Sequence, residues 1–421
     1  MTQRKVLSYS IKCMNKHHLL LLAVIFGLVM YSCDENGAVM SLEEKTLFSL
    51  NYGNFEDELN LFSLANPGPI KTCIEMRDGF FYIANGESKK VMEFNSYGDL
   101  ISIFYNDETN PVPSFATTED AQQDMAGTRK AISYPLNSVG EIAVDSRKYL
   151  YVVDKLPVER QEQDTKNRTL LSQVVLRFDS GGNFMDYIGQ QGPGGVPFPH
   201  VRDIYTTDEN ELVVVCQTND GMMAYWFNDT GYLMYTVPFS VSQLPNPLQE
   251  QTEFEMFVSL EKIVPSYTEK KLFVKVDYYT TTMDTASNVQ SGIDYTATLL
   301  FPLDVETGVY GQPLTIPPYE ENVSDGLTRL VYPLSYEFLG TTDSGWLFFM
   351  VADDGGYTVQ MIQEDEQKVL VRHLDVDHNE NLYYDFVLSP TGIISALFVK
   401  EDKVTISWWR TDTLVDALIQ G

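Results

Sequence analysis

Residues 174–188 read VVLRFDSGGNFMDYI, an apolar strand, a turn of Asp, Ser and Gly, and a second strand. Asp and Gly tolerate the left-handed backbone that a tight hairpin requires. The pattern recurs as VMEFNSYGDLISI at 91–103 and AYWFNDTGYLMYTV at 224–237, with looser copies at 298–310, 358–371 and 404–415. Six hairpins of one kind indicate a repeat architecture.

A second hairpin precedes each of these copies. Clear examples are IAVDSRKYLYVV at 142–153 and LGTTDSGWLFFM at 339–350, and the others begin at 74, 204, 263 and 386. Two hairpins make four strands, which is one propeller blade. The sequence therefore predicts an all-β, six-bladed β-propeller over residues 45–421. Seven blades, or a pair of β-sandwiches, remain as alternatives.

The closure of the ring is also predictable. Residues 46–62, TLFSLNYGNFEDELNLF, match the outer strand and link of a blade without its hairpin. We expect this N-terminal strand to complete the last blade. The stretch FDSGGNFMDYIGQQGPGGVPFPHVRDIYTTDENELVVV at 178–215 resembles the NHL-type propeller repeat, with its hairpin glycine, outer strand, Gly-rich link and Phe-Pro entry into the next inner strand.

The N-terminus is typical of a helical signal peptide over residues 1–32, with Met14 as an alternative start. Lys12 and Lys16 precede an apolar run of 12 residues at 19–30, shorter than the roughly 20 that cross a bilayer. The run ends in Met30-Tyr31-Ser32-Cys33, which resembles the relaxed lipobox of spirochaetal lipoproteins. That resemblance implies cleavage before Cys33 and a diacylglycerol on its thiol, with palmitate among the acyl chains. Ordinary secretory cleavage is the alternative.

The lipobox, the segment LFSLNYGNFEDELNLF and the NHL-like blades together resemble a family of spirochaetal β-propeller lipoproteins. The resemblance implies that residues 33–44 are a lipid-anchored linker. It also implies a place in the cell envelope, facing the periplasm or the cell exterior. It implies little about activity.

Charge restricts the partners. The whole chain carries a formal net charge of −30, and after residue 32 only 25 basic residues stand against 59 acidic ones. Because the domain after residue 32 is so acidic, it repels nucleic acid. For the same reason it needs an anchor to stay at an anionic membrane. Cys73 and Cys216 lie in apolar strands, where a buried free thiol is the commoner outcome, although a disulfide remains open.

Insertions concentrate in two kinds of connection. The turns within hairpins are short, and the long segments link a blade's second and third strands or pass to the next blade. These long segments are residues 106–134, 155–172, 238–255, 278–295 and 318–329. The two kinds of connection meet at one end of a propeller, so a single long-loop face is predicted, suited to a protein partner.

Candidate binding residues lie at the start of the inner strands, which line a propeller's axial channel. His200, Arg202 and Asp203 follow the Gly-Pro link, and Glu141, Glu261 and Lys262 occupy comparable positions. These groups are predicted to bind a ligand at the channel mouth. The alternative is that they are solvated or paired with one another.

No sequence motif for catalysis, metal binding or a cofactor stands out. The hypothesis is therefore a non-enzymatic binding or scaffold propeller, anchored to a membrane and using its long-loop face. The alternative is a propeller enzyme at the axial channel, such as a metal-dependent lactonase-type hydrolase or a quinone-dependent dehydrogenase.

Overall fold

The computed structural model describes residues 39–63, 66–69, 71–116, 129–251, 255–284, 289–325, 328–363 and 368–414. Residues 41–421 form one compact unit. The expected signal peptide and Cys33 lie outside the described residues. Within those ranges, no helix has the length and apolarity to span a bilayer.

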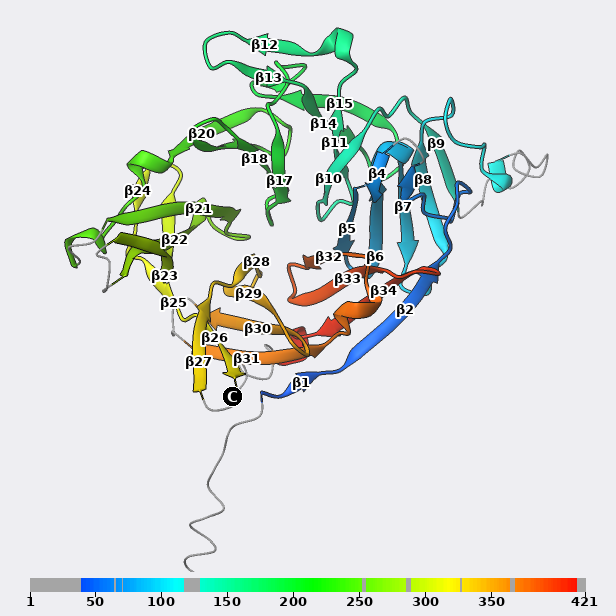
Figure 1. The fold of residues 1–421 in the computed structure, drawn as a ribbon. Helices are drawn as coiled ribbons and strands as arrows, with labels where there is room; N and C mark the ends of the chain where they lie inside the picture. The colour runs from blue at the N-terminus through cyan, green and yellow to red at the C-terminus, as the bar shows by residue number, and fades with distance from the viewer. Residues whose placement is uncertain are drawn as a thin grey trace, which may run out of the picture. The chain divides into compact units, whose positions relative to one another are not determined.

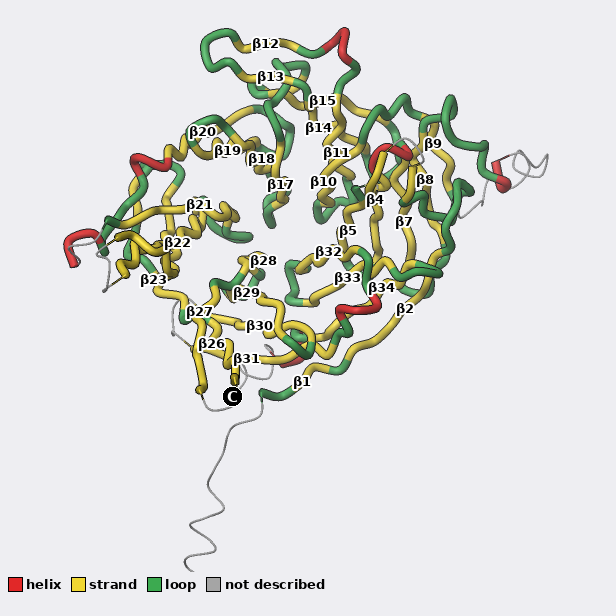
Figure 2. The backbone as a smooth tube through the Cα atoms, in the orientation of Figure 1, coloured by secondary structure: helices red, strands yellow, loops and turns green. Residues whose placement is uncertain are grey.

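Six largely antiparallel sheets follow one another along the chain as the blades of a β-propeller (Figures 1 and 2). From the axis outward, blade 1 contains β5 (Thr72–Arg77), β6 (Phe80–Asn85), β7 (Lys90–Asn95), β8 (Leu100–Tyr105) and β9 (Lys130–Ser133). Blade 2 contains β10 (Val139–Val144), β11 (Leu150–Lys155), β14 (Gln173–Phe178), β15 (Phe184–Gly189) and β16 (Gly192–Pro193). Blade 3 contains β17 (Val201–Thr206), β18 (Leu212–Gln217), β19 (Gly221–Phe227) and β20 (Leu233–Ser240).

The remaining blades repeat this order. Blade 4 contains β21 (Met256–Pro265), β22 (Lys271–Asp284), β23 (Val289–Asp304), β24 (Val309–Tyr310) and β25 (Leu314–Ile316). Blade 5 contains β28 (Glu337–Thr341), β29 (Trp346–Asp353), β30 (Gly356–Gln363), β31 (Lys368–Asp375) and β1 (Ser41–Leu42). Blade 6 contains β32 (Tyr383–Leu388), β33 (Ile393–Val399), β34 (Val404–Arg410) and β2 (Glu44–Leu50). The predicted six-bladed propeller is confirmed.

Short connecting elements complete the described chain. Single 3-10 turns are η1 (Gly86–Ser88), η2 (Ser114–Ala116), η4 (Val158–Arg160), η5 (Val241–Gln243), η6 (Gln249–Gln251) and η7 (His378–Glu380). A small hairpin of β3 (Phe62–Ser63) and β4 (Asn66–Pro69) precedes blade 1.

The ring closes through the N-terminal segment, as the sequence predicts. β2 pairs antiparallel with β34, from Glu44 opposite Trp409 to Leu50 opposite Val404. Just before it, β1 adds a short parallel edge to β31. Strand pairing thus begins at Ser41, inside residues 33–44, which the sequence predicts to be a linker.

Asx turns explain the recurring hairpin of the sequence. The side-chain oxygen of Asp179 accepts hydrogen bonds from the backbone N–H groups of Gly181 and Asn183, and Gly182 has a φ of 87°. Asn228 makes the same pair of bonds to Thr230 and Tyr232. The acidic or amide residue closes the turn, and glycine supplies the left-handed backbone.

The inner hairpins of blades 2, 3, 5 and 6 are capped in a related way by a buried polar residue directly after the inner strand. Asp145 accepts from the N–H groups of Arg147 and Tyr149, and Thr342 accepts from that of Trp346. Because all are buried, each cap satisfies backbone groups that water could not reach.

The apolar core lies between neighbouring blades. One cluster joins blades 3 and 4 around the buried Trp226, and another joins blades 5 and 6 around Trp346 and Trp409. Cys73 and Cys216 are buried and free, as the apolar strands predict.

The insertions depart from the expected loops. Residues 155–172 include a hairpin of β12 (Glu162–Asp164) and β13 (Thr169–Leu171), and residues 278–295 continue β22 and β23. The crossing at 318–329 belongs to a hairpin of β26 (Tyr319–Asp325) and β27 (Thr328–Leu334). Pairing satisfies the backbone hydrogen bonds of these polar segments. Strand order places all three at the ends where the inner strands begin, which we call the long-loop face.

Candidate ligand site in the axial channel

A cavity of about 400 Å³ follows the axis, lined by residues of all six inner strands. Five of these strands supply a carboxylate, and β21 supplies Lys262 instead. The five carboxylates are Glu75, Glu141, Asp203, Glu337 and Asp385. A cavity of this size and polarity suits a small molecule.

Bulges in four inner strands help to place these groups. The register shifts between Val139 and Ile142, between Val201 and Asp203, between Leu260 and Lys262, and between Phe338 and Gly340. A bulge inserts one residue and re-aims the side chains next to it. Charged residues at the start of these strands thereby face the channel instead of the core.

Ion pairs organise the mouth of the channel at the long-loop face. The Nζ of Lys262 lies 3.8 Å from Asp203 and 4.0 Å from Glu337, and Lys71 pairs with Glu141. Lys262, Asp203 and Glu337 also line a second cavity of about 520 Å³, so the two cavities meet at these three residues. A buried pair of Lys275 and Asp277, 2.8 Å apart, forms part of its wall.

The opposite end, at the short hairpin turns, is narrowed by a contact across the axis. Arg77 of blade 1 donates a 2.7 Å hydrogen bond to the hydroxyl of Tyr267, in the turn after β21 of blade 4. Its guanidinium also lies 5.6 Å from the centre of the tyrosine ring. Figure 1 shows β5 and β21 on opposite sides of the ring. The channel is therefore a pocket with a wide mouth and a narrowed floor.

Two carboxyl groups inside the pocket hold their protons unusually tightly. Burial raises the pKa of Glu75 to about 8, although nearby Arg77 opposes the rise. Burial also raises the pKa of Asp385 to about 7, although its carboxylate accepts a 2.8 Å hydrogen bond from the N–H of Ile74. Such shifts are typical of functional sites in clefts.

Donors near the floor are left without partners. Arg77 is 6% exposed, yet its Nε has no hydrogen-bond partner among the described residues. The hydroxyl of Tyr205, which also lines the cavity, is buried and equally without a partner in the described chain. Unsatisfied buried polar groups are costly.

The candidates from the sequence separate into three groups. Glu141 and Asp203 line the axial cavity, and Arg202 and Glu261 line the cavity at its mouth. His200 is exposed, and its carbonyl accepts from the N–H of Gln217. It lies outside the linings of both cavities.

Sequence reasoning missed four residues that line the pocket: Glu75, Arg77, Glu337 and Asp385. The repeats as read from the sequence began at 339 and 386, just beyond Glu337 and Asp385. An alignment of the six inner strands on their first charged residue would have found both. The contact of Arg77 with Tyr267 leaves no local signal, because it joins opposite blades.

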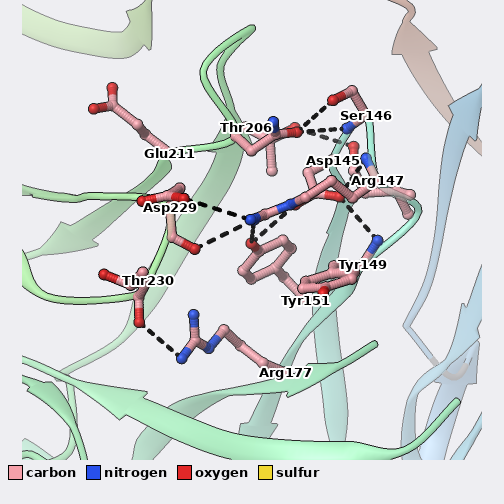
Figure 3. Close-up of polar contacts among 12 residues, drawn as sticks. Asp145, Ser146, Arg147, Tyr149, Tyr151, Arg177, Thr206, Glu211, Asp229 and Thr230 are labelled. Carbon is pink, nitrogen blue, oxygen red and sulfur yellow. Dashed lines mark hydrogen bonds and ion pairs between the residues drawn. The ribbon is translucent and has the colours of Figure 1, made fainter. Parts of the chain in front are cut away.

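A separate polar cluster lies between blades 2 and 3 at the short-turn face (Figure 3). Arg147 pairs with buried Asp145 at 2.7 Å and reaches the carbonyl of Asp229 in the next blade. Arg177 binds Asp186 through two bonds and donates to the carbonyl of Thr230. Because these groups satisfy one another, the cluster serves to join the blades.

Within the described ranges, no group of three or more His, Cys, Asp or Glu side chains is arranged to hold a metal ion.

Comparison with known proteins gives structural likeness only. No family model and no curated protein matches the sequence. The polysaccharide lyase Uly1 aligns over 88% of this chain and 99% of its own, with a TM-score of 0.41 and 6% identity. A gluconolactonase from Xanthomonas campestris aligns over 88% and 97%, at 0.36 and 9%. The propeller domain of the Trilobed protease from Pyrococcus furiosus aligns over 80% and 95%, at 0.37 and 8%.

Proposed function

We propose that this protein is a non-enzymatic binding propeller of the cell envelope. Lipid on Cys33 tethers it to a membrane outside the cytoplasm, and a small polar ligand enters its axial pocket from the long-loop face. The observation that carries the proposal is the pocket itself, with five carboxyl groups on its wall and the guanidinium of Arg77 towards its floor.

The tether rests on the sequence of residues 19–33 alone. Metabolic labelling with an alkyne analogue of palmitate tests it directly. Labelling of the wild-type protein and its loss in Cys33→Ser would support the tether. Equal labelling of both variants would contradict it.

The binding role is tested by thermal unfolding of the purified protein against a broad metabolite library. Gly340 lines the pocket, and a Cβ built there would approach the side chain of Leu388 at 3.4 Å. Gly340→Leu should therefore narrow the channel and abolish any ligand-induced rise in the unfolding temperature. Gly292→Leu is the matched control. Gly292 lies in the first part of β23, outside the lining of the cavity, and a Cβ built there would approach only the side chain of Thr282.

A protein partner at the long-loop face is the second candidate. Three insertions carry exposed apolar side chains. These are Leu170 in the hairpin β12–β13, Ile293 in the first part of β23, and Val331 and Tyr332 in β27. Exposed apolar side chains on such extended insertions can form part of an interaction surface. Recurrent crosslinks in cells from Lys166 or Lys130 to one protein would support this candidate, and crosslinks scattered among many proteins would contradict it.

A further inference from the structure

The pocket holds a guanidinium and two carboxyl groups that the protein leaves without ion-pair partners. In the described part of the chain, no carboxylate lies within 4.0 Å of the Arg77 guanidinium, and no cation lies that close to Glu75 or Asp385. The other basic residue that lines the cavity, Lys262, already has ion-pair partners in Asp203 and Glu337. The charged forms of Glu75 and Asp385 are disfavoured where no cation is near, so a ligand that supplies an ammonium group to them and a carboxylate to Arg77 would gain affinity from both contacts.

Strand geometry explains why Glu75 and Arg77 do not pair with each other. They are two residues apart on β5, so their side chains leave the same face of the strand. Their Cα atoms are about 7 Å apart along an extended strand. Arg77 extends across the axis to Tyr267 rather than back towards Glu75.

Asp385 adds a second acceptor beside Glu75. Its Oδ2 accepts the N–H of Ile74, the residue before Glu75. That bond fixes the carboxylate of blade 6 against the inner strand of blade 1. Two acceptors thus stand on one side of the pocket, and the guanidinium of Arg77 lies towards its floor.

We propose that the axial pocket binds a compact zwitterion, an amino acid or a very short peptide. Its ammonium group lies between Glu75 and Asp385, and its carboxylate meets the guanidinium of Arg77. Each charged group of the ligand then makes charge-assisted hydrogen bonds, which are stronger than neutral ones. This inference rests on the proposed binding function and specifies its ligand class.

The test measures binding of the standard L-α-amino acids and of Ala-Ala to the purified protein, by thermal shift and then calorimetry. The best binder is compared with its carboxamide and with its N-acetyl derivative. Each derivative should bind about tenfold more weakly or worse, because each removes a charge-assisted contact. Derivatives that bind as tightly as the parent would overturn the inference.

Variants assign the two ends of the ligand. Glu75→Gln should remove the preference for the free amine over the N-acetyl form, and Asp385→Asn should weaken it. Arg77→Gln should remove the preference for the free acid over the amide. Arg77→Lys, which keeps the charge, covers the case in which Arg77→Gln fails to fold. Glu159→Gln, in exposed η4, is the control and should leave both preferences intact.

Two failures can be told apart. If only neutral sugars or dicarboxylates bind, and Gly340→Leu abolishes that binding, the binding function stands and the zwitterion is wrong. If binding of every ligand survives Gly340→Leu, both proposals fail.

Discussion

The guanidinium of Arg77 on blade 1 and the hydroxyl of Tyr267 on blade 4 meet at 2.7 Å across the axis of the ring. Blades that share no strand pairing are thereby linked through two side chains. The link also narrows one end of the channel, so that the charged long-loop mouth is the wider entry.

Removal of this link should cost stability. Tyr267→Phe deletes the acceptor and leaves a buried guanidinium with one bond fewer, so we expect a loss of about 1–2 kcal/mol in the free energy of unfolding. Denaturant titration measures the change. Tyr232→Phe, at a ring that is 64% exposed, should be nearly neutral.

Stability should fall as the pH rises towards 8. The folded-state pKa values of Asp385 and Glu75 are raised to about 7 and about 8, above their ordinary values of 3.8 and 4.5. Between these limits the folded state binds more protons than the unfolded state, so raising the pH favours unfolding. A full shift is worth about 1.4 kcal/mol per pKa unit. Screening by water in the channel reduces this to an expected total on the order of 2 kcal/mol.

The pH dependence has its own control. Asp385→Asn keeps an oxygen for the N–H of Ile74 but removes the titration, so its stability should vary less between pH 5 and pH 8 than that of the wild type. Glu159→Gln should retain the full dependence. A wild-type profile that rises over this range would contradict the assignment.

Two Arg–Asp pairs with the same bidentate geometry should differ sharply in energy. Arg177, 4% exposed, binds Asp186 on the neighbouring strand of blade 2, whereas Arg410 binds Asp412 at a site where the arginine is 49% exposed. Arg177→Ala should lower the free energy of unfolding by about 3 kcal/mol, because it leaves Asp186 without its partner in a partly buried place. Arg410→Ala should lower it by less than about 1 kcal/mol. Equal losses would show that burial does not govern these pairs.

The closing strand β2 should stabilise blade 1 as well as blade 6. The ring of Phe48 on β2 lies 5.8 Å from that of Phe81 and 5.5 Å from that of Phe94, both in blade 1. Phe48→Ala should therefore cost about 2–3 kcal/mol in chemical unfolding. Phe55→Ala, at a side chain that is 62% exposed, should have little effect.

The sequence predicted the blades because each carries its own local signals. The turn of Asp179 and Gly182 and the alternating strands beside it depend only on neighbouring residues. Closure by β2 was also predictable, since residues 46–62 repeat an outer strand. Paired hairpins such as β26–β27 were missed, because their composition is polar and typical of loops.

The pocket was only partly predictable. Glu141 and Asp203 belong to strand starts that a repeat alignment identifies, and both line the channel. His200 shares that neighbourhood in sequence but is exposed, because it ends the link before β17 begins. The roles of Arg77 and Asp385 depend on contacts with other blades, which no local pattern encodes.

The seam between β2 and β34 also determines how the ring would carry mechanical load. A pull on the N-terminal segment acts along β2, whose hydrogen bonds to β34 lie across the direction of the force. Such a seam is loaded in shear, so its bonds, from the pair of Glu44 with Trp409 to that of Leu50 with Val404, resist together. A ring pulled through this seam withstands load better than one whose strands are peeled apart one hydrogen bond at a time.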